Sequence, residues 1–89
     1  MHISIIDDEK LLVNRVLKKL KSHGYAASAF YGYEDFMLNG DAHSQLYIID
    51  LSLGDGSGFD IIRWLRENNG SQVPIIIVSG YNDSQNIIY

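Results

Sequence analysis

The sequence predicts a three-layer α/β fold, in which a parallel sheet carries helices on both faces. Apolar runs suited to buried strands alternate along the chain with segments whose apolar residues recur at helical spacing. The runs at 3–6, 46–50 and 73–78 are almost continuously apolar, as expected of parallel strands that are buried on both sides. The predicted order is therefore β-α-β-α-β-α-β, followed by a helical segment.

The first strand–helix unit carries the clearest change of period. A strand at 3–6 is closed by acidic residues, and the helix that follows starts at Glu9. Asp8 is the candidate N-cap of this helix, and Gly24 stands just beyond its end. The apolar residues of the helix recur at intervals of three and four: Leu12, Val13, Val16, Leu17 and Leu20.

Two more strand–helix units and a fourth strand follow. A weaker strand at 25–30, rich in alanine, precedes a short helix at 32–38. The strand at 46–50 passes through a loop of Gly and Ser into a helix at 58–66. The fourth strand spans 73–78. The helix at 58–66 is predicted to bury one face, made by Phe59, Ile62 and Leu65 or their neighbours.

The last segment is predicted to be a helix from Gln85 to Tyr89, with its capped start at 82–84. The 89 residues contain no internal repeat, low-complexity segment or linker. A single domain over residues 1–89 is therefore expected.

Composition narrows the classes of function. Apolar residues make up 46% of the chain and charged residues 20%, which is typical of a globular protein. The net charge of −4 disfavours direct binding of nucleic acid. The chain has no Cys, so it has no disulfide, thiolate metal site or thiol nucleophile. No basic leader and no run of about 20 apolar residues is present, so a cytoplasmic protein away from membranes is expected.

Three carboxylates and a hydroxyl are predicted to meet at one edge of the sheet. Parallel strands place their carboxyl ends together, and if the three apolar strands are neighbours, a shallow pocket would hold Asp7, Asp8, Asp50 and Ser79. At about 4 Å and an effective dielectric constant of about 20, one like-charge pair costs about 4 kcal/mol. A hard divalent cation is the simplest neutraliser, and Mg²⁺ combines carboxylates, waters and phosphate oxygens.

Each of these features, taken alone, has an ordinary structural explanation. Asp7 and Asp8 are typical helix-capping residues, Asp50 is a typical turn residue, and Ser79 opens a loop. Their shared edge is what favours a site for metal and phosphate.

The order of these motifs resembles the receiver domain of two-component response regulators. The matching segments are Ile5-Ile6-Asp7-Asp8-Glu9, Ile48-Ile49-Asp50-Leu51-Ser52-Leu53, Gly58 and Pro74-Ile75-Ile76-Ile77-Val78-Ser79-Gly80. The resemblance runs from Ile3 to the end of the chain. It implies a flavodoxin-like fold with strand order 2-1-3-4-5, of which this chain would hold four strands and lack the fifth strand and helix.

The resemblance also implies a role for each matching residue. Asp50 would be the phosphoacceptor, phosphorylated by a sensor histidine kinase or a phosphotransfer protein. Asp8 and Asp50 would bind Mg²⁺ together with the main-chain carbonyl of Ser52, and Asp7 would act through water. Ser79 would move its hydroxyl to a phosphoryl oxygen and so report the phosphorylated state. Longer members of the family would carry an output domain.

The sequence departs from the receiver pattern at several points. Gly54 stands where the family usually has Pro, and Ser57 replaces a frequent Asp. The family takes a phosphate-pairing Lys from its fifth strand, whereas no Lys or Arg follows Arg66 here. Lys10 begins the first helix and is interpreted as a solvated side chain. Phosphorylation of this chain is therefore predicted to be impaired.

Two other functions remain open. The first is a binding module without phosphotransfer, which would associate with itself through an exposed fourth strand or through the final helix. The second is a phosphohydrolase with an aspartyl nucleophile. That chemistry generally uses a second acidic residue two positions after the nucleophile, where Ser52 stands. A regulatory phosphoacceptor, rather than an enzyme, is therefore the preferred interpretation.

Overall fold

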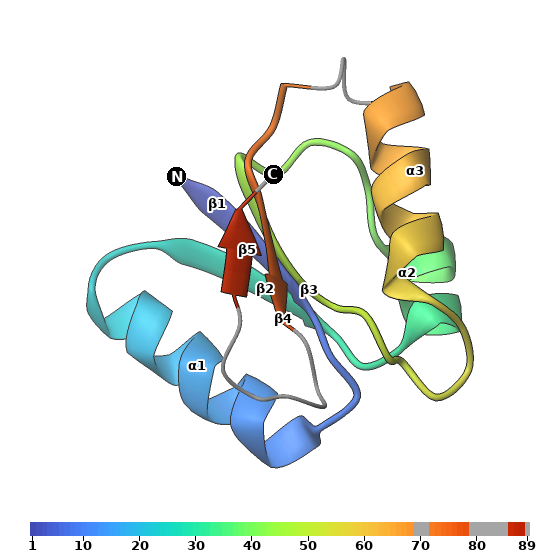
Figure 1. Ribbon diagram of the computed structural model, residues 1–89. Coiled ribbons are helices and arrows are strands. Elements are labelled where there is room, and N and C mark those ends of the chain that lie inside the picture. Colours follow the sequence, from blue (N-terminus) through green and yellow to red (C-terminus); the bar gives the residue numbers. More distant parts are fainter. Residues whose placement is uncertain (69–71, 79–85, 89) are drawn as a thin grey trace.

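The described residues form a sheet of five strands in the order β2-β1-β3-β4-β5, of which the first four in sequence are parallel, as predicted (Figure 1). A computed structural model describes residues 1–68, 72–78 and 86–88. The strands are β1 (His2–Ile6), β2 (Ala26–Phe30), β3 (Leu46–Asp50), β4 (Ile75–Val78) and β5 (Asn86–Ile88).

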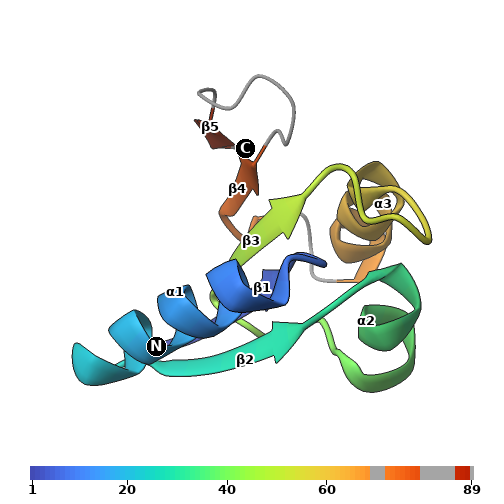
Figure 2. The same cartoon turned by 90° about the horizontal axis from the view of Figure 1, so that it is seen from below.

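In the described part of the chain, three helices flank the sheet and form the outer two layers. Helix α1 (Lys10–Ser22) lies on one face, and α2 (Tyr33–Asn39) and α3 (Gly58–Asn68) lie on the other (Figures 1 and 2). This arrangement confirms the predicted three-layer fold. None of the helices in the described ranges is long and apolar enough to cross a lipid bilayer.

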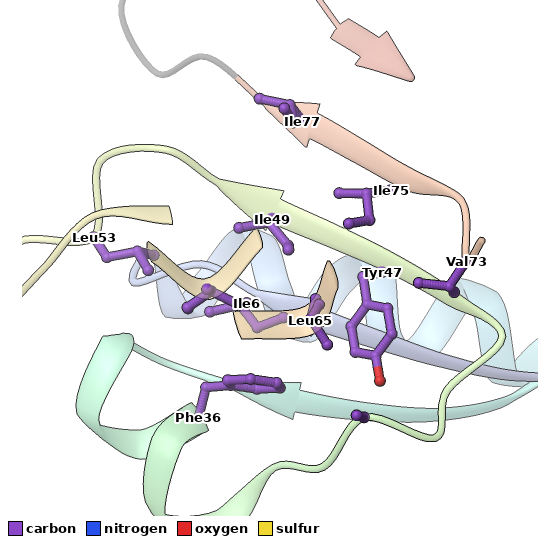
Figure 3. Packing of buried hydrophobic residues seen from close by; sticks show 11 residues of the cluster. Ile6, Phe36, Tyr47, Ile49, Leu53, Leu65, Val73, Ile75 and Ile77 are labelled. Carbon is purple, nitrogen blue, oxygen red and sulfur yellow. The ribbon is translucent and has the colours of Figure 1, made fainter. Parts of the chain in front are cut away.

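The main core lies between the sheet and the pair α2/α3 (Figure 3). Alternation along the strands turns every second side chain toward these helices. The side chains that contribute to this core include Ile6, Phe36, Tyr47, Ile49, Leu53, Ile61, Leu65, Ile75 and Ile77. The Phe36 ring stands edge-on to Phe30, Tyr47 and Trp64, with centroid distances of 5.3, 6.3 and 5.8 Å.

Helix α3 buries a slightly different face from the one predicted. Leu65 is fully buried as expected, but Ile61 is its buried partner, and Phe59 is 53% exposed. A Cβ on Gly58 would overlap the main-chain oxygen of Asp50, so the start of the helix is fixed against the end of β3. From that start, the residues three and seven positions on share the inward face with Gly58, which selects Ile61 and Leu65.

The N-cap of α1 also differs from the prediction. Glu9 occupies the cap position without a capping side-chain bond, and Asp8 does not cap the helix. Instead, the Glu9 N–H donates to Asp7 Oδ1 at 2.9 Å. The predicted stop is confirmed, because Gly24 follows the helix with φ +89°.

The end of the chain corrects two expectations. A helix was expected over Gln85 to Tyr89, but residues 86–88 form β5, which pairs antiparallel with β4. Adjacent Ile87 and Ile88 are β-branched and favour extended backbone, and β4 offers an edge with free N–H and C=O groups. The outer edge of β4 is thus occupied by β5 rather than unpaired. Gln85, Tyr89 and the expected cap at 82–84 lie outside the described residues.

Candidate functional site

Two neighbouring parallel strands bring the predicted carboxylates together. Ile6 of β1 pairs with Ile49 of β3, so Asp7 and Asp50 follow side by side at the carboxyl ends of their strands. Asp8 follows Asp7 directly in the chain. One carboxylate oxygen from each of these three residues lies within 4.8 Å of the others. Their proximity, predicted from the apolar strands alone, is what the structure shows.

Two of the three carboxylates are buried, and the third is open to solvent. Asp7 is 8% exposed and Asp50 is 7% exposed, whereas Asp8 is exposed. Burial raises the pKa of both Asp7 and Asp50, and repulsion from Asp8 adds to both increases. The Glu9 and Ser52 N–H groups donate to Asp7 and Asp50 at 2.9 and 3.1 Å and oppose these increases only in part. The cluster therefore favours a proton or a cation.

The donor set fits a hard divalent cation. It consists of carboxylate oxygens, with no sulfur and no imidazole in the cluster. Mg²⁺ prefers oxygen ligands, and the exposed side of Asp8 leaves room for waters or for phosphate oxygens. Asp7, Asp8 and Asp50 are the residues that would hold such an ion.

The loop that follows Asp50 keeps close to the cluster. Gly54 adopts φ +76°, a conformation that other residues rarely take, and a Cβ there would lie 3.0 Å from Asp8 Oδ2. Ser52, the predicted carbonyl ligand, lies in this loop, and its N–H is bonded to Asp50.

Two other residues that the sequence singled out lie elsewhere or outside the described ranges. Ser79, the predicted switch hydroxyl, is outside the described residues; the residue before it, Val78, pairs with Asp50 in the sheet. The Lys10 ammonium lies 5.7 Å from the centroid of the Tyr31 ring.

Sequence reasoning missed the carboxylate of Asp55. Its oxygens accept the N–H groups of Tyr33 and Glu34 at 2.8 and 3.1 Å. No local sequence pattern predicts these hydrogen bonds, because their donors belong to α2, about twenty residues earlier in the chain. An Asp inside a Gly- and Ser-rich loop reads as an ordinary turn residue.

Comparison with known proteins gives a consistent family. The model of the response regulator receiver domain matches residues 3–89. The transcriptional regulatory protein PmrA of Pectobacterium parmentieri is 38% identical over 80 residues, which cover 89% of this chain and 36% of that protein. The two-component response regulator PhoP of Pseudomonas aeruginosa is 31% identical over 86 residues, covering 96% of this chain and 38% of that protein. The chain thus spans less than two fifths of either relative.

A solved structure agrees with the sequence relatives. It is a response regulator protein from Burkholderia pseudomallei, described with a phosphorylated aspartic acid, a calcium ion and citrate. It superposes with a TM-score of 0.78 at 25% identity, covering 90% of this chain and 47% of that one. With the parallel sheet, the acidic edge and a family match over nearly its whole length, the chain belongs to the receiver domains of two-component response regulators.

Proposed function

We propose that this chain is a phosphoacceptor switch, in which Asp50 takes up a phosphoryl group in a Mg²⁺-dependent step. The observation that carries this proposal is the cluster of three carboxylates within 4.8 Å of one another at the carboxyl ends of β1 and β3. Burial of Asp7 and Asp50 beside Asp8 places like charges together, and a bound cation would neutralise them.

The proposed transfer is a displacement at phosphorus. A carboxylate oxygen of Asp50 forms a bond to phosphorus, and the P–N bond to a histidine of the donor protein breaks. The electron pair of that bond stays on the imidazole nitrogen, and the product is an acyl phosphate on Asp50. Mg²⁺, when bound, would neutralise charge on the phosphoryl oxygens. Asp8, Asp50 and the Ser52 carbonyl would hold the ion directly, and Asp7 would hold it through water.

The relatives support further parts of the proposal. The Burkholderia pseudomallei structure combines a phosphorylated aspartic acid with a calcium ion, which is the pairing of acyl phosphate and divalent cation proposed here. The phosphoryl donor would be a sensor histidine kinase or a phosphotransfer protein, and Ser79 would report the phosphorylated state. In this proposal residues 1–89 act as one cytoplasmic receiver unit. Because the curated relatives are longer, an output domain is part of the proposal.

The test uses beryllofluoride and acetyl phosphate, each with Mg²⁺. The wild-type chain should bind Mg²⁺ and beryllofluoride in calorimetric titrations, and Asp50→Asn should bind no beryllofluoride. The matched control is Asp60→Asn, which removes an exposed carboxylate of α3 that pairs only with Arg63 among the described residues. Equal beryllofluoride binding by Asp50→Asn and the wild type would contradict the proposal. Mass spectrometry after acetyl phosphate then measures how much phosphoryl transfer the chain completes.

A second candidate function is association without phosphoryl transfer. The ammonium of Lys10, the basic residue nearest in sequence to Asp7 and Asp8, lies 5.7 Å from the centroid of the Tyr31 ring and is engaged there. Binding of Mg²⁺ and beryllofluoride without any acyl phosphate would favour this candidate. Self-association through β4 would then require displacement of β5, because β5 already pairs with that edge. Sedimentation at micromolar concentration separates a monomer from such an assembly.

A further inference from the structure

The loop at 51–57 folds back on itself between β3 and α3. Within it, the Asp55 N–H donates to the Leu53 carbonyl at 2.7 Å, and the Leu53 N–H donates to the Gly56 carbonyl at 3.3 Å. Leu53 is buried in the core beneath the loop. At the loop's first residues, the Ser52 N–H is bonded to Asp50. The loop therefore has a defined shape, anchored on the side of the acidic cluster.

Asp55 anchors the opposite side of this loop to α2. Its Oδ1 accepts the Tyr33 N–H at 2.8 Å, and its Oδ2 accepts the Glu34 N–H at 3.1 Å. These N–H groups belong to the first turn of the helix and have no partner within it. The preceding residue, Gly32, has no side chain to cap them, and a Cβ there would lie only 3.1 Å from Asp55 Oδ1. A residue distant in sequence thus supplies the cap.

The same contacts favour the charged form of the Asp55 carboxylate. The N–H groups of Glu34 and Tyr33 lower the pKa of Asp55 below its usual range. Close packing reinforces this contact between loop and helix: a Cβ on Gly56 would lie 2.7 Å from Tyr33 Cβ. The loop is therefore held between the start of α2 and the cluster of Asp7, Asp8 and Asp50.

We infer that Asp55 is a positioning residue, which holds the loop at 51–57 so that the main chain at Ser52 and Gly54 stays against the acidic cluster. Asp55 itself does not belong to the cluster. The inference rests on the proposed function, since its consequence is tighter binding of Mg²⁺ by residues that Asp55 does not touch. Partners that orient the direct ligands of a metal typically change its affinity by about 10-fold or more.

The experiment compares two truncations at the same helix. Asp55→Ala removes the tie between the loop and α2. The matched control, Asp35→Ala, removes a carboxylate that accepts the Tyr31 N–H at 2.9 Å and the Asn39 side-chain N–H at 2.8 Å, so its bonds stay within 31–39. Both variants loosen α2, but only the first frees the loop. In calorimetric titrations, Asp55→Ala should bind Mg²⁺ about 10-fold more weakly than the wild type, and Asp35→Ala should bind it within about 2-fold.

Hydrogen exchange gives a readout that does not depend on affinity. Mg²⁺ should slow exchange of the Tyr33 and Glu34 amides in the wild type, because the ion fixes the loop that caps them. It should leave these amides unchanged in Asp55→Ala. Asp55→Asn keeps one acceptor oxygen, so its Mg²⁺-dependent slowing of exchange should be intermediate between wild type and Asp55→Ala. This graded response distinguishes loss of the tie from a folding defect in the alanine variant.

The outcomes separate this inference from the proposed function. If the wild type binds Mg²⁺ and Asp55→Ala binds it equally well, the positioning role of Asp55 is wrong and the proposed function stands. A loss in Asp35→Ala as large as in Asp55→Ala also overturns the inference, because general loosening of α2 would then explain both. If the wild type binds no Mg²⁺, both fail.

Discussion

The two faces of the sheet are packed very differently. Toward α2 and α3, alternate residues of β1, β3 and β4 are fully covered: Ile6, Tyr47, Ile49, Ile75 and Ile77. Toward α1, among the residues that the structure describes, Ile3 and Ile5 of β1 are buried and Val13 is the buried residue of the helix. Farther along the sheet on that side, Ile48 and Ile76 are only half-buried.

The α2/α3 face of the sheet carries most of the buried core, and the α1 face carries the carboxylates of the candidate site. Helices α2 and α3 cover the aromatic and aliphatic core on one face, whereas α1 on the other contacts β1 and β2. By strand alternation, Asp50 follows Ile48 on the side of α1. The sparsely covered face therefore also ends in the buried carboxylates, where charge repulsion opposes folding.

The largest expected contrast is between two leucines on opposite faces. Leu65→Ala in α3 empties a fully buried position and should lower the free energy of unfolding by about 2–5 kcal/mol. Leu17→Ala in α1 removes a half-buried side chain and should cost about 1 kcal/mol. Urea unfolding followed by circular dichroism measures both. Equal losses of unfolding free energy in the two variants would mean that the two faces of the sheet contribute equally to stability.

A smaller effect on stability, a gain rather than a loss, is expected on replacing Asp50, which lies on the α1 face at the end of β3. The pKa of Asp50 is raised above its ordinary value of 3.8, chiefly by burial, so the folded state holds its proton more tightly than the unfolded state. The contribution of Asp50 to stability is thus fully present below that value and is lost as pH rises through the raised pKa.

Asp50→Asn cannot lose a proton, so it should be more stable than the wild type near neutral pH. The difference should shrink as pH falls toward 3.8. Thermal midpoints measured across this range, without divalent cations, provide the check, with Asp60→Asn as the control for an exposed carboxylate. A constant difference at all pH values would show that titration of Asp50 is not its cause.

The smallest effects on the free energy of unfolding are expected at exposed leucines on the outer surfaces of α1 and α2. Leu11 of α1 is 81% exposed, and Leu38 of α2 is 74% exposed. Replacing either with Gln should change the free energy of unfolding by less than about 0.5 kcal/mol. A clearly larger loss for Leu11→Gln, measured in the same urea titrations, would reveal packing on the α1 side beyond what its exposure indicates.

The sequence is sufficient to predict the elements from β1 to β4 and the acidic cluster because both follow from local patterns. Apolar strands closed by Asp7 and Asp50 and the rule that parallel strands end together were enough to bring these side chains into one place. The alanine-rich strand predicted at 25–30 is confirmed as β2, although alanine has a low propensity for strands.

What the sequence did not reveal depends on contacts between distant segments. The rotation of α3 is fixed by the close approach of Gly58 to the main chain of Asp50, which no helical period encodes. The cap that Asp55 provides for α2 depends on a fold that must form first. At the end of the chain, pairing with the edge of β4 prevailed over the capping signals that favoured a helix.

Because Asp7 and Asp50 become neighbours only when β1 pairs with β3, cation binding and strand pairing are linked equilibria. A ligand of the folded cluster that has no affinity for the unfolded chain would stabilise the fold by about 2.7 kcal/mol at 100 times its Kd. The same ligand would slow every opening that separates Ile6 from Ile49, so amide exchange along this pair of strands would report occupancy of the cluster. The paired strands β1 and β3 thus position the carboxylates, and their amide exchange rates report whether a cation is bound.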